Sequence, residues 1–475
     1  MIKPIKILQN SIFLALQPLF MQVISLFVVG YIARKLGRAD FGIFNFVTAF
    51  TMLFYPLAVL GLNRVTVRDL AGITDNGEYA QRMITLRLVA LLLCTIMIIG
   101  LVHTAGYPAR TETAVYLASA VFLFQLLSEA LTDVFNANQQ MKYTALVGLI
   151  AGLTLTVLSV VVLYLGFGLF ELLGVYAFGQ LLGMLVAAVI ASRVFFKIRL
   201  RFSMSFTKAK LAEGFQFFLM TMTWFAMMRI DTVFLSKKVS MEQLGLYTAA
   251  ILLVTKLSFI PHAISSALLP AFSQAYSAGE TKEISALSGT LISKILLFTL
   301  PFVLTTSAFA EDIVVIIFGN KFVQAGPILK IGIWAFLFTC MAFCEFSLLT
   351  AIHRQKYLLL SYIISGLYCV VANLILINLY RTHGAILAFA STQLLLFCLF
   401  TYYTTKFISG FLQWKSLLLI VLINSGYFLF ISGFREPISL MCIPIGLILY
   451  VAIASAVKLI GLKDINKLKA SISGI

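Results

Sequence analysis

Long apolar runs recur along the whole chain and constrain its fold more than any other feature of the sequence. A membrane-spanning helix needs about 20 mostly apolar residues. Runs of that length occur at 11–32, 41–62, 83–104, 113–134, 144–166, 173–195, 213–235, 244–269, 286–309, 327–352, 358–380, 385–405, 415–433 and 439–461. The loops between them reach at most about 20 residues, too few for a folded domain outside the membrane. The sequence therefore predicts an all-α polytopic membrane protein with about 14 transmembrane helices.

Composition and charge define the setting of these helices. Only 11% of the residues are charged and 61% are hydrophobic, which excludes an ordinary soluble enzyme. The net charge of +17 would suggest a nucleic-acid partner in a soluble protein. Here, loops on the side of the N-terminus carry about twice as many Lys and Arg as the opposite loops. This bias predicts a multi-pass protein of the cytoplasmic (inner) membrane, with both termini in the cytoplasm, membrane lipids as neighbours and no nucleic-acid partner.

A short sequence repeat divides the chain. Residues 31–44 align without a gap with residues 234–247, and Gly42 then aligns with Gly245. An even number of predicted spans separates the copies, so they share one orientation, as in parallel repeats related about the membrane normal. The repeat predicts two six-helix lobes, which transporters rock around a substrate site between them. The predicted boundaries are an N-terminal lobe at 1–196, a basic cytoplasmic linker at 197–212, a C-terminal lobe at 213–405, and two extra helices with a basic tail at 406–475.

Several ordered segments resemble a known family. They are 31–42 (YIARKLGRADFG), 60–71 (LGLNRVTVRDLA), 229–232 (RIDT) with 244–250 (LGLYTAA), 267–270 (ALLP) and 316–322 (IIFGNKF). Together they resemble the polysaccharide-export flippases (O-antigen type) of the multidrug/oligosaccharidyl-lipid/polysaccharide exporter superfamily. The resemblance implies a flippase that moves an undecaprenyl-diphosphate-linked oligosaccharide across the membrane by alternating access. The translocated oligosaccharide would be used to assemble O-antigen, lipopolysaccharide, capsule or another surface glycan. The resemblance also implies other polysaccharide-assembly proteins as partners.

Cationic side chains inside the predicted spans are the principal candidate site residues, because a charge within the membrane is costly unless it is paired or hydrated. We predict a cationic cavity that binds the diphosphate, made by Arg229 and Lys256 with Lys294 and Arg87. Arg229 would supply a bidentate fork and Lys256 a point charge. Pro261 supports Lys256, since a proline frees backbone carbonyls where a span lines a polar cavity. Alternatively, each cation is neutralised by a carboxylate on another helix, or Lys294 reaches the head groups.

Carboxylates within the spans are candidate coupling groups or charge partners of these cations. They are Asp231, Glu129, Asp133 and Glu345. Glu129 and Asp133 lie one helical turn apart, where two carboxylates together favour binding of a proton or a cation. Alternatively, Asp133 is solvated at the membrane interface. A proton or sodium gradient would then drive transport. No bound cofactor or metal is expected, because all six Cys lie in apolar runs and no nucleotide-binding motif is present.

Polar and aromatic residues supply weaker candidates for contacts with the sugar. They are Gln17, Tyr55, Gln125 and Trp224. Most polar side chains in spans instead form hydrogen bonds to neighbouring helices, and His262 is expected to be packed in the core. Four prolines are predicted to break the first, second, eighth and ninth helices, namely Pro18, Pro56, Pro261 and Pro301.

Two other function classes compete with the flippase. A cation-coupled multidrug exporter of the same superfamily would concentrate carboxylates in its cavity, whereas the deepest charges here are mostly cations. A membrane glycan polymerase would need a long outer loop with catalytic Arg or His, and the loops here are short. The sequence therefore predicts a transporter, specifically a flippase, and not an enzyme.

Overall fold

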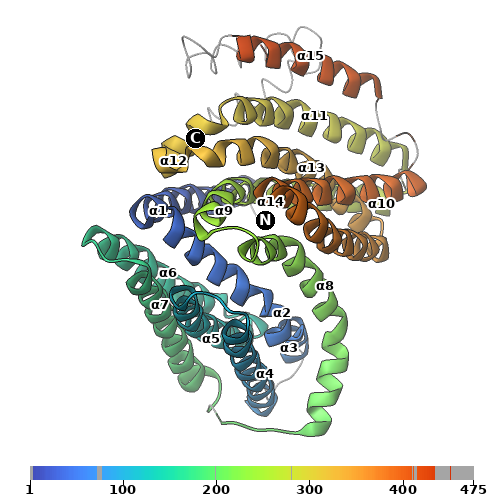
Figure 1. Cartoon of the computed structure of the whole chain (residues 1–475). Helices are drawn as coiled ribbons and strands as arrows, with labels where there is room; N and C mark the ends of the chain where they lie inside the picture. The colour runs from blue at the N-terminus through green and yellow to red at the C-terminus, as the bar shows by residue number, and fades with distance from the viewer. Residues whose placement is uncertain are drawn as a thin grey trace.

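The computed structural model of the chain describes residues 4–71, 77–197, 199–279, 281–408, 410, 414–433 and 450, and the side chains of 4–24, 267, 281–283, 414 and 432–433 lie outside that description. All regular elements within these residues are helices (Figure 1). They are α1 (Pro4–Leu53), α2 (Tyr55–Val59), α3 (Leu62–Leu70), α4 (Gly77–Thr104), α5 (Ala109–Ala137), α6 (Met141–Tyr164), α7 (Leu169–Ile190), the π-helical turn η1 (Ala191–Phe195), α8 (Met204–Ser236), α9 (Met241–Lys256), α10 (Phe259–Ser277), α11 (Thr281–Ala308), α12 (Ala310–Phe318), the 3₁₀-helix η2 (Asn320–Ala325), α13 (Gly326–Ala351), α14 (Gln355–Phe407) and α15 (Trp414–Gly433). The predicted all-α membrane fold is confirmed, and it is the fold that satisfies backbone hydrogen bonds inside each apolar segment.

The helices follow the predicted spans. Among the described residues, 10 helices are long and apolar enough to cross a membrane, and two of them hold two predicted spans each. α1 leaves the helical conformation at Gly37 (φ 76°, ψ 177°), in the predicted basic turn. α14 does so at Arg381 (φ 53°, ψ −123°), and it folds back so closely that a Cβ on Gly384 would collide with the Leu376 carbonyl.

The C-terminal region is described in part. α15 covers the predicted span at 415–433. The predicted span at 439–461 and the basic tail lie outside the described residues, apart from Tyr450. The total of fourteen spans therefore stays a prediction.

Two of the four predicted proline breaks occur. α1 ends at Leu53, and α2 begins with Pro56 in its first turn. α9 and α10 are separated at 257–258, just before Pro261. In both places the chain interrupts a predicted span, as expected where a proline removes a backbone donor.

The predictions for Pro18 and Pro301 were wrong, because both lie inside continuous helices. At Pro301 a side chain replaces the missing backbone donor. Pro301 cannot donate to the carbonyl of Leu297, one turn earlier, and the Tyr450 hydroxyl donates to that carbonyl at 2.5 Å instead. Neighbouring groups of this kind allow proline within membrane helices.

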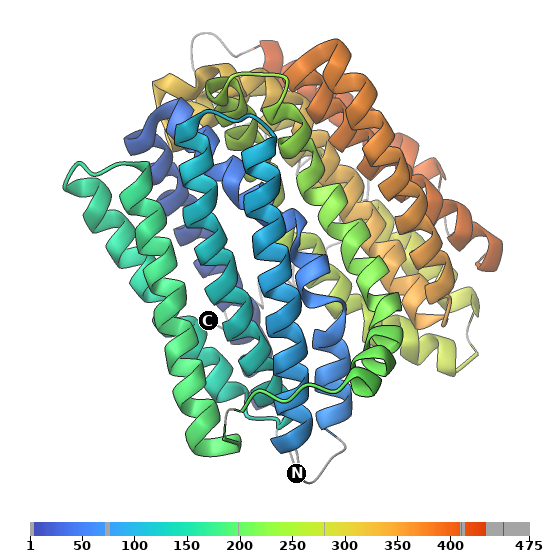
Figure 2. The same ribbon diagram turned by 60° about the horizontal axis from the view of Figure 1, so that its bottom comes forward.

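An extended segment joins the N-terminal half (α1–α7) to the C-terminal half (α8–α15). Figure 2 shows this segment running from the end of η1 past the helix ends to α8. It is held on α4, since Gln81 donates to the Lys197 carbonyl (2.8 Å) and the Arg201 N–H donates to Thr85 Oγ1 (2.9 Å). α8 begins at Met204, so only the first part of the predicted linker at 197–212 is non-helical.

At one end of the bundle, loops predicted to lie outside the cytoplasm meet each other. The Arg38 guanidinium donates to Gln324 Oε1 (3.3 Å), and the Arg381 guanidinium donates to the Lys238 carbonyl (3.3 Å). Loops so far apart in sequence can share one end only if successive helices alternate in direction. The excess of Lys and Arg in the loops on the side of the N-terminus was counted on the assumption of this alternation.

The two copies of the sequence repeat pack against each other at the same end. A Cβ on Gly42 would collide with the Met241 carbonyl, and a Cβ on Gly245 would collide with the Arg38 carbonyl. Because both positions lack a Cβ, the backbones of α1 and α9 come into contact. The aligned glycines thus face each other across the boundary between the halves.

At the opposite end, charged residues join the halves. Asp69 of α3 accepts hydrogen bonds from Lys210 Nζ (2.8 Å) and the Tyr79 hydroxyl (2.6 Å), and Arg68 pairs with Glu213 of α8. We call these five residues the Asp69 cluster. Burial opposes ionisation of Asp69, but hydrogen bonds from Arg68, Lys210 and Tyr79 outweigh it and hold its pKa at about 2. Asp69 is therefore ionised at neutral pH.

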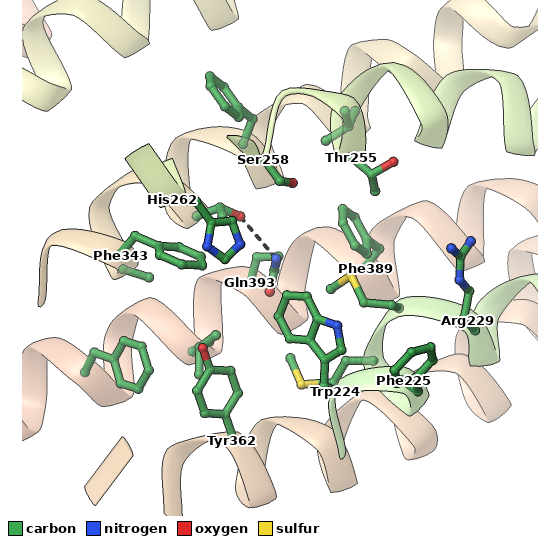
Figure 3. Close-up of a pocket in the computed structure, with 18 residues that line it drawn as sticks. Trp224, Phe225, Arg229, Thr255, Ser258, His262, Phe343, Tyr362, Phe389 and Gln393 are labelled. Carbon is green, nitrogen blue, oxygen red and sulfur yellow. Dashed lines mark hydrogen bonds between the residues drawn. The ribbon is translucent and has the colours of Figure 1, made fainter. Parts of the chain in front are cut away.

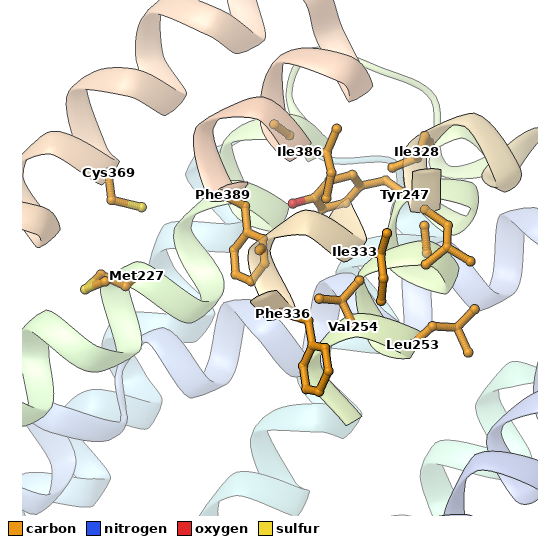
Figure 4. Close-up of a cluster of buried hydrophobic side chains, with 14 of the residues drawn as sticks. Met227, Tyr247, Leu253, Val254, Ile328, Ile333, Phe336, Cys369, Ile386 and Phe389 are labelled. Carbon is orange, nitrogen blue, oxygen red and sulfur yellow. The ribbon is translucent and has the colours of Figure 1, made fainter. Parts of the chain in front are cut away.

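A hydrophobic core fills the C-terminal half where α8, α9, α13 and α14 meet (Figure 4). Met227, Val254, Phe336 and Phe389 belong to this core and also line the cavity of the candidate site. The close packing of these side chains fixes the cavity wall.

Candidate functional site

A cavity of about 280 Å³ lies between α8, α9, α10, α13 and α14 (Figure 3). Its apolar wall is mainly aromatic, with Trp224, Phe225, Phe336, Phe343, Tyr362, Phe389 and Phe400. Its polar groups are Arg229, Thr255, Ser258, His262, Thr339 and Gln393. All the residues that line it come from the C-terminal half. This cavity therefore lies within one half, whereas the sequence predicted a substrate site between the two lobes.

Arg229 is the cation of the cavity. Its side chain is exposed, and among the described residues it forms no ion pair or hydrogen bond. Asp231 is two residues away but faces elsewhere. Its carboxylate accepts hydrogen bonds from the Tyr247 hydroxyl and from the N–H (2.6 Å) and hydroxyl (3.2 Å) of Thr232. The alternative in which a carboxylate neutralises Arg229 is therefore not observed.

Lys256 lies at the edge of the cavity and points toward the N-terminal half. It is the last residue of α9, and its Nζ donates to Ser25 Oγ of α1 at 2.6 Å. Thr255 and Ser258, on either side of it in sequence, line the cavity. The break before Pro261 thus places Lys256 beside the cavity of Arg229, but its ammonium is directed to α1.

Arg87 belongs to a separate cluster in the N-terminal half. Its buried guanidinium donates to Asp133 and lies 3.7 Å from Glu129, whose Oε1 accepts a hydrogen bond from the Tyr55 hydroxyl at 2.6 Å. We call these four residues the Arg87 cluster. The prediction of Arg87 as a ligand in the cationic cavity was wrong for this conformation, because both neighbouring carboxylates already neutralise it.

Lys294 is also separate from Arg229. It lines a lateral groove with apolar side chains of α10, α11 and α13, including Phe298 and Phe302, and only Phe336 is shared with the cavity. The single cationic cavity of four residues predicted from the sequence is therefore incorrect. One of the four, Arg229, lines the cavity, and Lys256 lies at its edge.

Glu345 is the most completely buried carboxyl among these candidates. It lies on α13 with no exposed surface, and the Thr401 hydroxyl of α14 is 2.8 Å from its Oε1. Its Oε2 has no hydrogen-bond partner, and no described Lys, Arg or His forms an ion pair with it. Glu345 is thus not a charge partner of the predicted cations.

The predicted sugar contacts have different locations. Trp224 lines the cavity with 38% of its surface exposed. Tyr55 stacks on Phe225 (ring centroids 4.6 Å apart) and directs its hydroxyl to Glu129. Gln125 lies one turn before Glu129 on α5, and the side chain of Gln17 lies outside the described residues. Among the described side chains of this set, Trp224 is therefore the one that faces the cavity.

Sequence reasoning missed five polar groups of the cavity, namely Thr255, Ser258, His262, Thr339 and Gln393. His262 was expected in the core, but it lies in the wall with its ring against Phe343 (centroids 4.3 Å apart). Gln393 donates to Thr339 Oγ1 at 3.1 Å, the bond drawn in Figure 3. The break at Pro261 is a sequence signal for His262, whereas Gln393 and Thr339 meet only through the packing of α13 on α14.

The cavity combines three kinds of recognition. An unpaired guanidinium can bind a phosphate through two parallel hydrogen bonds. Aromatic faces present apolar surface to a ring, and Gln393, Thr255 and Ser258 offer hydrogen bonds to hydroxyl groups. No group of three metal-ligating side chains is found in the described part of the chain. The site can therefore bind an anionic, polyhydroxylated ligand.

Comparison with known proteins identifies a matching family and a similar curated protein. The profile of a family described as "Polysaccharide biosynthesis protein" matches residues 31–327. The "Probable low-salt glycan biosynthesis flippase Agl15" of Haloferax volcanii is 21% identical over 418 residues, 86% of this chain and 86% of that protein.

Solved structures share the fold. The lipid II flippase MurJ in an inward closed conformation matches with a TM-score of 0.75 at 15% identity, over 94% of this chain and 98% of that one. An inward-facing multidrug resistance MATE family transporter of the MOP superfamily matches with a TM-score of 0.59 at 14% identity, over 84% and 98%. The chain thus has a membrane transporter fold.

Proposed function

The chain belongs to the polysaccharide biosynthesis protein family, and we propose that it is a flippase that moves a lipid-linked oligosaccharide across the membrane. The observation that carries the proposal is Arg229, an unpaired guanidinium in the aromatic cavity of a transporter fold. Two proteins to which the chain is similar are named as a glycan biosynthesis flippase and as a lipid II flippase. These names support a lipid-linked glycan as the substrate class.

The substrate that fits the site best is an oligosaccharide on undecaprenyl diphosphate. Its diphosphate carries about two negative charges, which need compensation in a low-dielectric region. Arg229 would form a bidentate contact with it, and Lys256 would add a second cation after exchanging Ser25 for phosphate. Trp224 and the other aromatic side chains would contact the first sugar.

The size of the cavity bears on how the substrate is accommodated. Its volume of about 280 Å³ is at the lower end of ligand pockets, about 300–1,000 Å³. It would hold the diphosphate or one sugar ring rather than a whole repeat unit. Transport therefore requires that the cavity widen.

Alternating access would provide this change. We assign the rocking units to residues 1–196 and 213–405, with α15 and the remaining C-terminal residues outside them. Support comes from the contact between Gly42 and the start of α9 at one end, and from the Asp69 cluster at the other. Separation of the halves at either end would open the site to one side.

The proposed flippase would lie in the cytoplasmic membrane and act on a lipid-linked glycan there. The excess of Lys and Arg in alternate loops supports the cytoplasmic membrane with both termini in the cytoplasm. The lipid carrier and the surrounding lipids are then the immediate partners, and other polysaccharide-assembly proteins would supply or receive the glycan. Neither O-antigen nor capsule is favoured by any contact in the site.

A multidrug exporter is the second candidate, because a MATE family transporter shares the fold and the cavity wall is rich in aromatic residues. The unpaired Arg229 disfavours it for cationic drugs, since the guanidinium would repel them. A glycan polymerase is disfavoured, because the Arg and His of the cavity, Arg229 and His262, lie within α8 and α10 and not in a long outer loop.

Deletion of the gene separates these functions. A flippase predicts loss of surface glycan, with the lipid-linked precursor retained in the cytoplasmic leaflet. Intact glycan with new drug sensitivity would favour the exporter. Single repeat units on the outer leaflet would identify a polymerase.

Substitution in the cavity tests the role of Arg229. Arg229→Ala should lower glycan export by about tenfold or more, since it removes a charge-assisted contact to phosphate, and Lys256→Ala should lower it less. Arg193→Ala is the matched control, because Arg193 is an exposed arginine in the π-helical turn after α7. Normal export by Arg229→Ala at wild-type protein levels would overturn the proposed diphosphate site.

A further inference from the structure

Glu345 is buried between α13 and α14 under conditions that disfavour its charge. Its side chain has no exposed surface, its Oε2 is without a partner, and Thr401 is its one hydrogen-bonding neighbour among the described residues. An isolated carboxylate in an apolar interior is so unfavourable that the group binds a proton instead. Burial and geometry therefore favour the carboxylic acid over the carboxylate.

The hydrogen bonds of Thr401 lead to the same conclusion. The Thr401 hydroxyl has one proton but two acceptors in range, Glu345 Oε1 at 2.8 Å and the Phe397 carbonyl at 2.9 Å. It can donate to only one of them. If Glu345 carries a proton, its O–H donates to Thr401 Oγ1 and the Thr401 proton goes to Phe397, so that both contacts are satisfied.

No charged group on the surrounding helices replaces this proton. Titratable side chains on α13 and on the elements packed against it include Cys340 and Cys344 on α13, Tyr362, Cys398 and Lys406 on α14, His262 on α10, Lys256 on α9 and Lys294 on α11, and none of these forms an ion pair with Glu345. Neutral thiols contribute no charge. His262 contacts Phe343, Lys256 donates to Ser25, and Lys294 lines the lateral groove.

A strip of polar groups connects Glu345 with the cavity. Thr339 and Gln393 line the cavity, and Glu345 with Thr401 follows two turns farther along the same two helices. Thr404 comes one turn after Thr401. Gln393 Oε1, Glu345 Oε2 and Thr404 Oγ1 are buried atoms without a hydrogen-bond partner. Three such atoms along one helix–helix interface are the groups that bound water satisfies.

We propose that Glu345 is a proton-binding site, which exchanges its proton with water along the interface of α13 and α14. The exchange is a simple transfer: the carboxylic acid and water give the carboxylate and a hydronium ion, and the reverse reaction restores the acid. If the protein is the flippase proposed above, protons bound at Glu345, and not sodium ions, drive transport; this second step rests on the proposed function. The cavity and the proton site share α13 and α14, so a change in the packing of these helices affects both.

Infrared spectroscopy of the purified full-length protein in lipid nanodiscs tests the proton site without any substrate. At neutral pH, the wild type should show a protonated-carboxyl band that shifts in heavy water and is absent from Glu345→Gln. Gln has the shape of the protonated acid and retains the Thr401 contact, so this variant should fold. Glu129→Gln is the matched control and should keep the band, because Glu129 is paired with Arg87.

Thr401→Val adds a second measurement on the same band. Removal of the one hydrogen-bonding neighbour should change the frequency of the Glu345 band without abolishing it. An unchanged band in Glu345→Gln would overturn the proton site, because the carboxyl of Glu345 would then be ionised at rest. A band that is lost in Glu345→Gln and unmoved in Thr401→Val would overturn the assigned hydrogen bond.

Glycan export in cells tests the coupling role. Glu345→Gln should lower export by about tenfold, a typical size for coupling between two ligands, and a protonophore should inhibit the wild type while removal of sodium does not. If gene deletion abolishes glycan but Glu345→Gln exports normally, the flippase stands and proton coupling through Glu345 fails. If the infrared band is assigned to Glu345 but deletion leaves glycan intact, the proton site stands and the proposed function fails.

Discussion

The Arg87 cluster and the surroundings of Arg229 contain the same kinds of side chain, yet they are arranged in opposite ways. In the N-terminal half, Arg87 is buried against Asp133 and Glu129. In the C-terminal half, Arg229 lies in the cavity without a partner among the described residues, and the acid Glu345 is buried on another helix. In the Arg87 cluster, the cation and the carboxylates neutralise one another within the protein. The arrangement around Arg229 leaves a cation for a ligand and an acid for a proton.

The difference comes from which helices are neighbours. α4 packs on α5, so Arg87 meets a face on which Gln125, Glu129 and Asp133 recur every four residues. α13 packs on α14, which offers Glu345 only the hydroxyl of Thr401. The depth of a charge in the membrane is therefore a poor guide to its role unless its partners are known.

Removal of Arg87 should have the largest effect on stability. Arg87→Ala leaves Asp133 buried without its counter-ion, which should destabilise the protein by about 3–5 kcal/mol. Thermal unfolding in detergent would measure the change. The double variant Arg87→Met with Asp133→Leu should recover most of the loss, since it removes both charges. No recovery would mean that packing, rather than charge, makes the Arg87 cluster important.

The Asp69 cluster offers an intermediate case, because its charges are paired and only partly exposed: Arg68 is exposed, whereas the side chains of Asp69 and Lys210 keep 14% and 16% of their surface exposed. The pKa of Asp69 in the folded protein, about 2, is below the usual value of about 3.9 in an unfolded chain. Its contribution is therefore complete above about pH 4 and is lost as the pH falls toward 2. We expect about 1–2 kcal/mol, less than the full shift would give, since water screens the exposed partners Arg68 and Glu213.

The measurement for this case is the pH dependence of unfolding in wild type and Asp69→Asn. The difference in stability between the two proteins should shrink between about pH 4 and pH 2. A difference that stays constant over this range would show that Asp69 acts through hydrogen bonds alone.

Removal of Arg229 should have the smallest effect on stability. Arg229→Ala breaks no ion pair among the described residues, so the free energy of unfolding should change by no more than about 0.5 kcal/mol, although glycan export should fall by about tenfold or more. Thermal unfolding under the same conditions as for Arg87→Ala provides the direct comparison. Destabilisation as large as that of Arg87→Ala would contradict the distinction between the two halves.

The fold was largely predictable, while the site was predictable only in part. The apolar runs located the helices, and the repeat identified Gly42 and Gly245, which face each other across the halves. Arg229 and Trp224 line a cavity and Lys256 lies beside it, while their predicted contacts with a substrate stay predictions. The grouping of Arg87 and Lys294 with Arg229 was wrong, because depth along a helix says nothing about the direction of a side chain relative to other helices.

Pro301 illustrates the same limit in the fold itself. Its ring predicts a break in α11, and the helix continues because Tyr450, about 150 residues away in sequence, donates to the Leu297 carbonyl. No local pattern around Pro301 contains that donor. His262 is similar, since its place in the cavity wall depends on where α10 meets α13.

The sequence by itself determined that this protein is a bundle of membrane helices, because the cost of exposing backbone polar groups to lipid leaves an apolar run of about 20 residues few other choices. It also showed that several charged residues lie within the spans, where each must be paired, hydrated or used to bind a ligand, because an isolated charge is costly in a membrane. Only the tertiary structure decided which charge is neutralised and which is free. That choice depends on distances of a few ångströms between side chains on different helices, over which an ion pair forms or does not form.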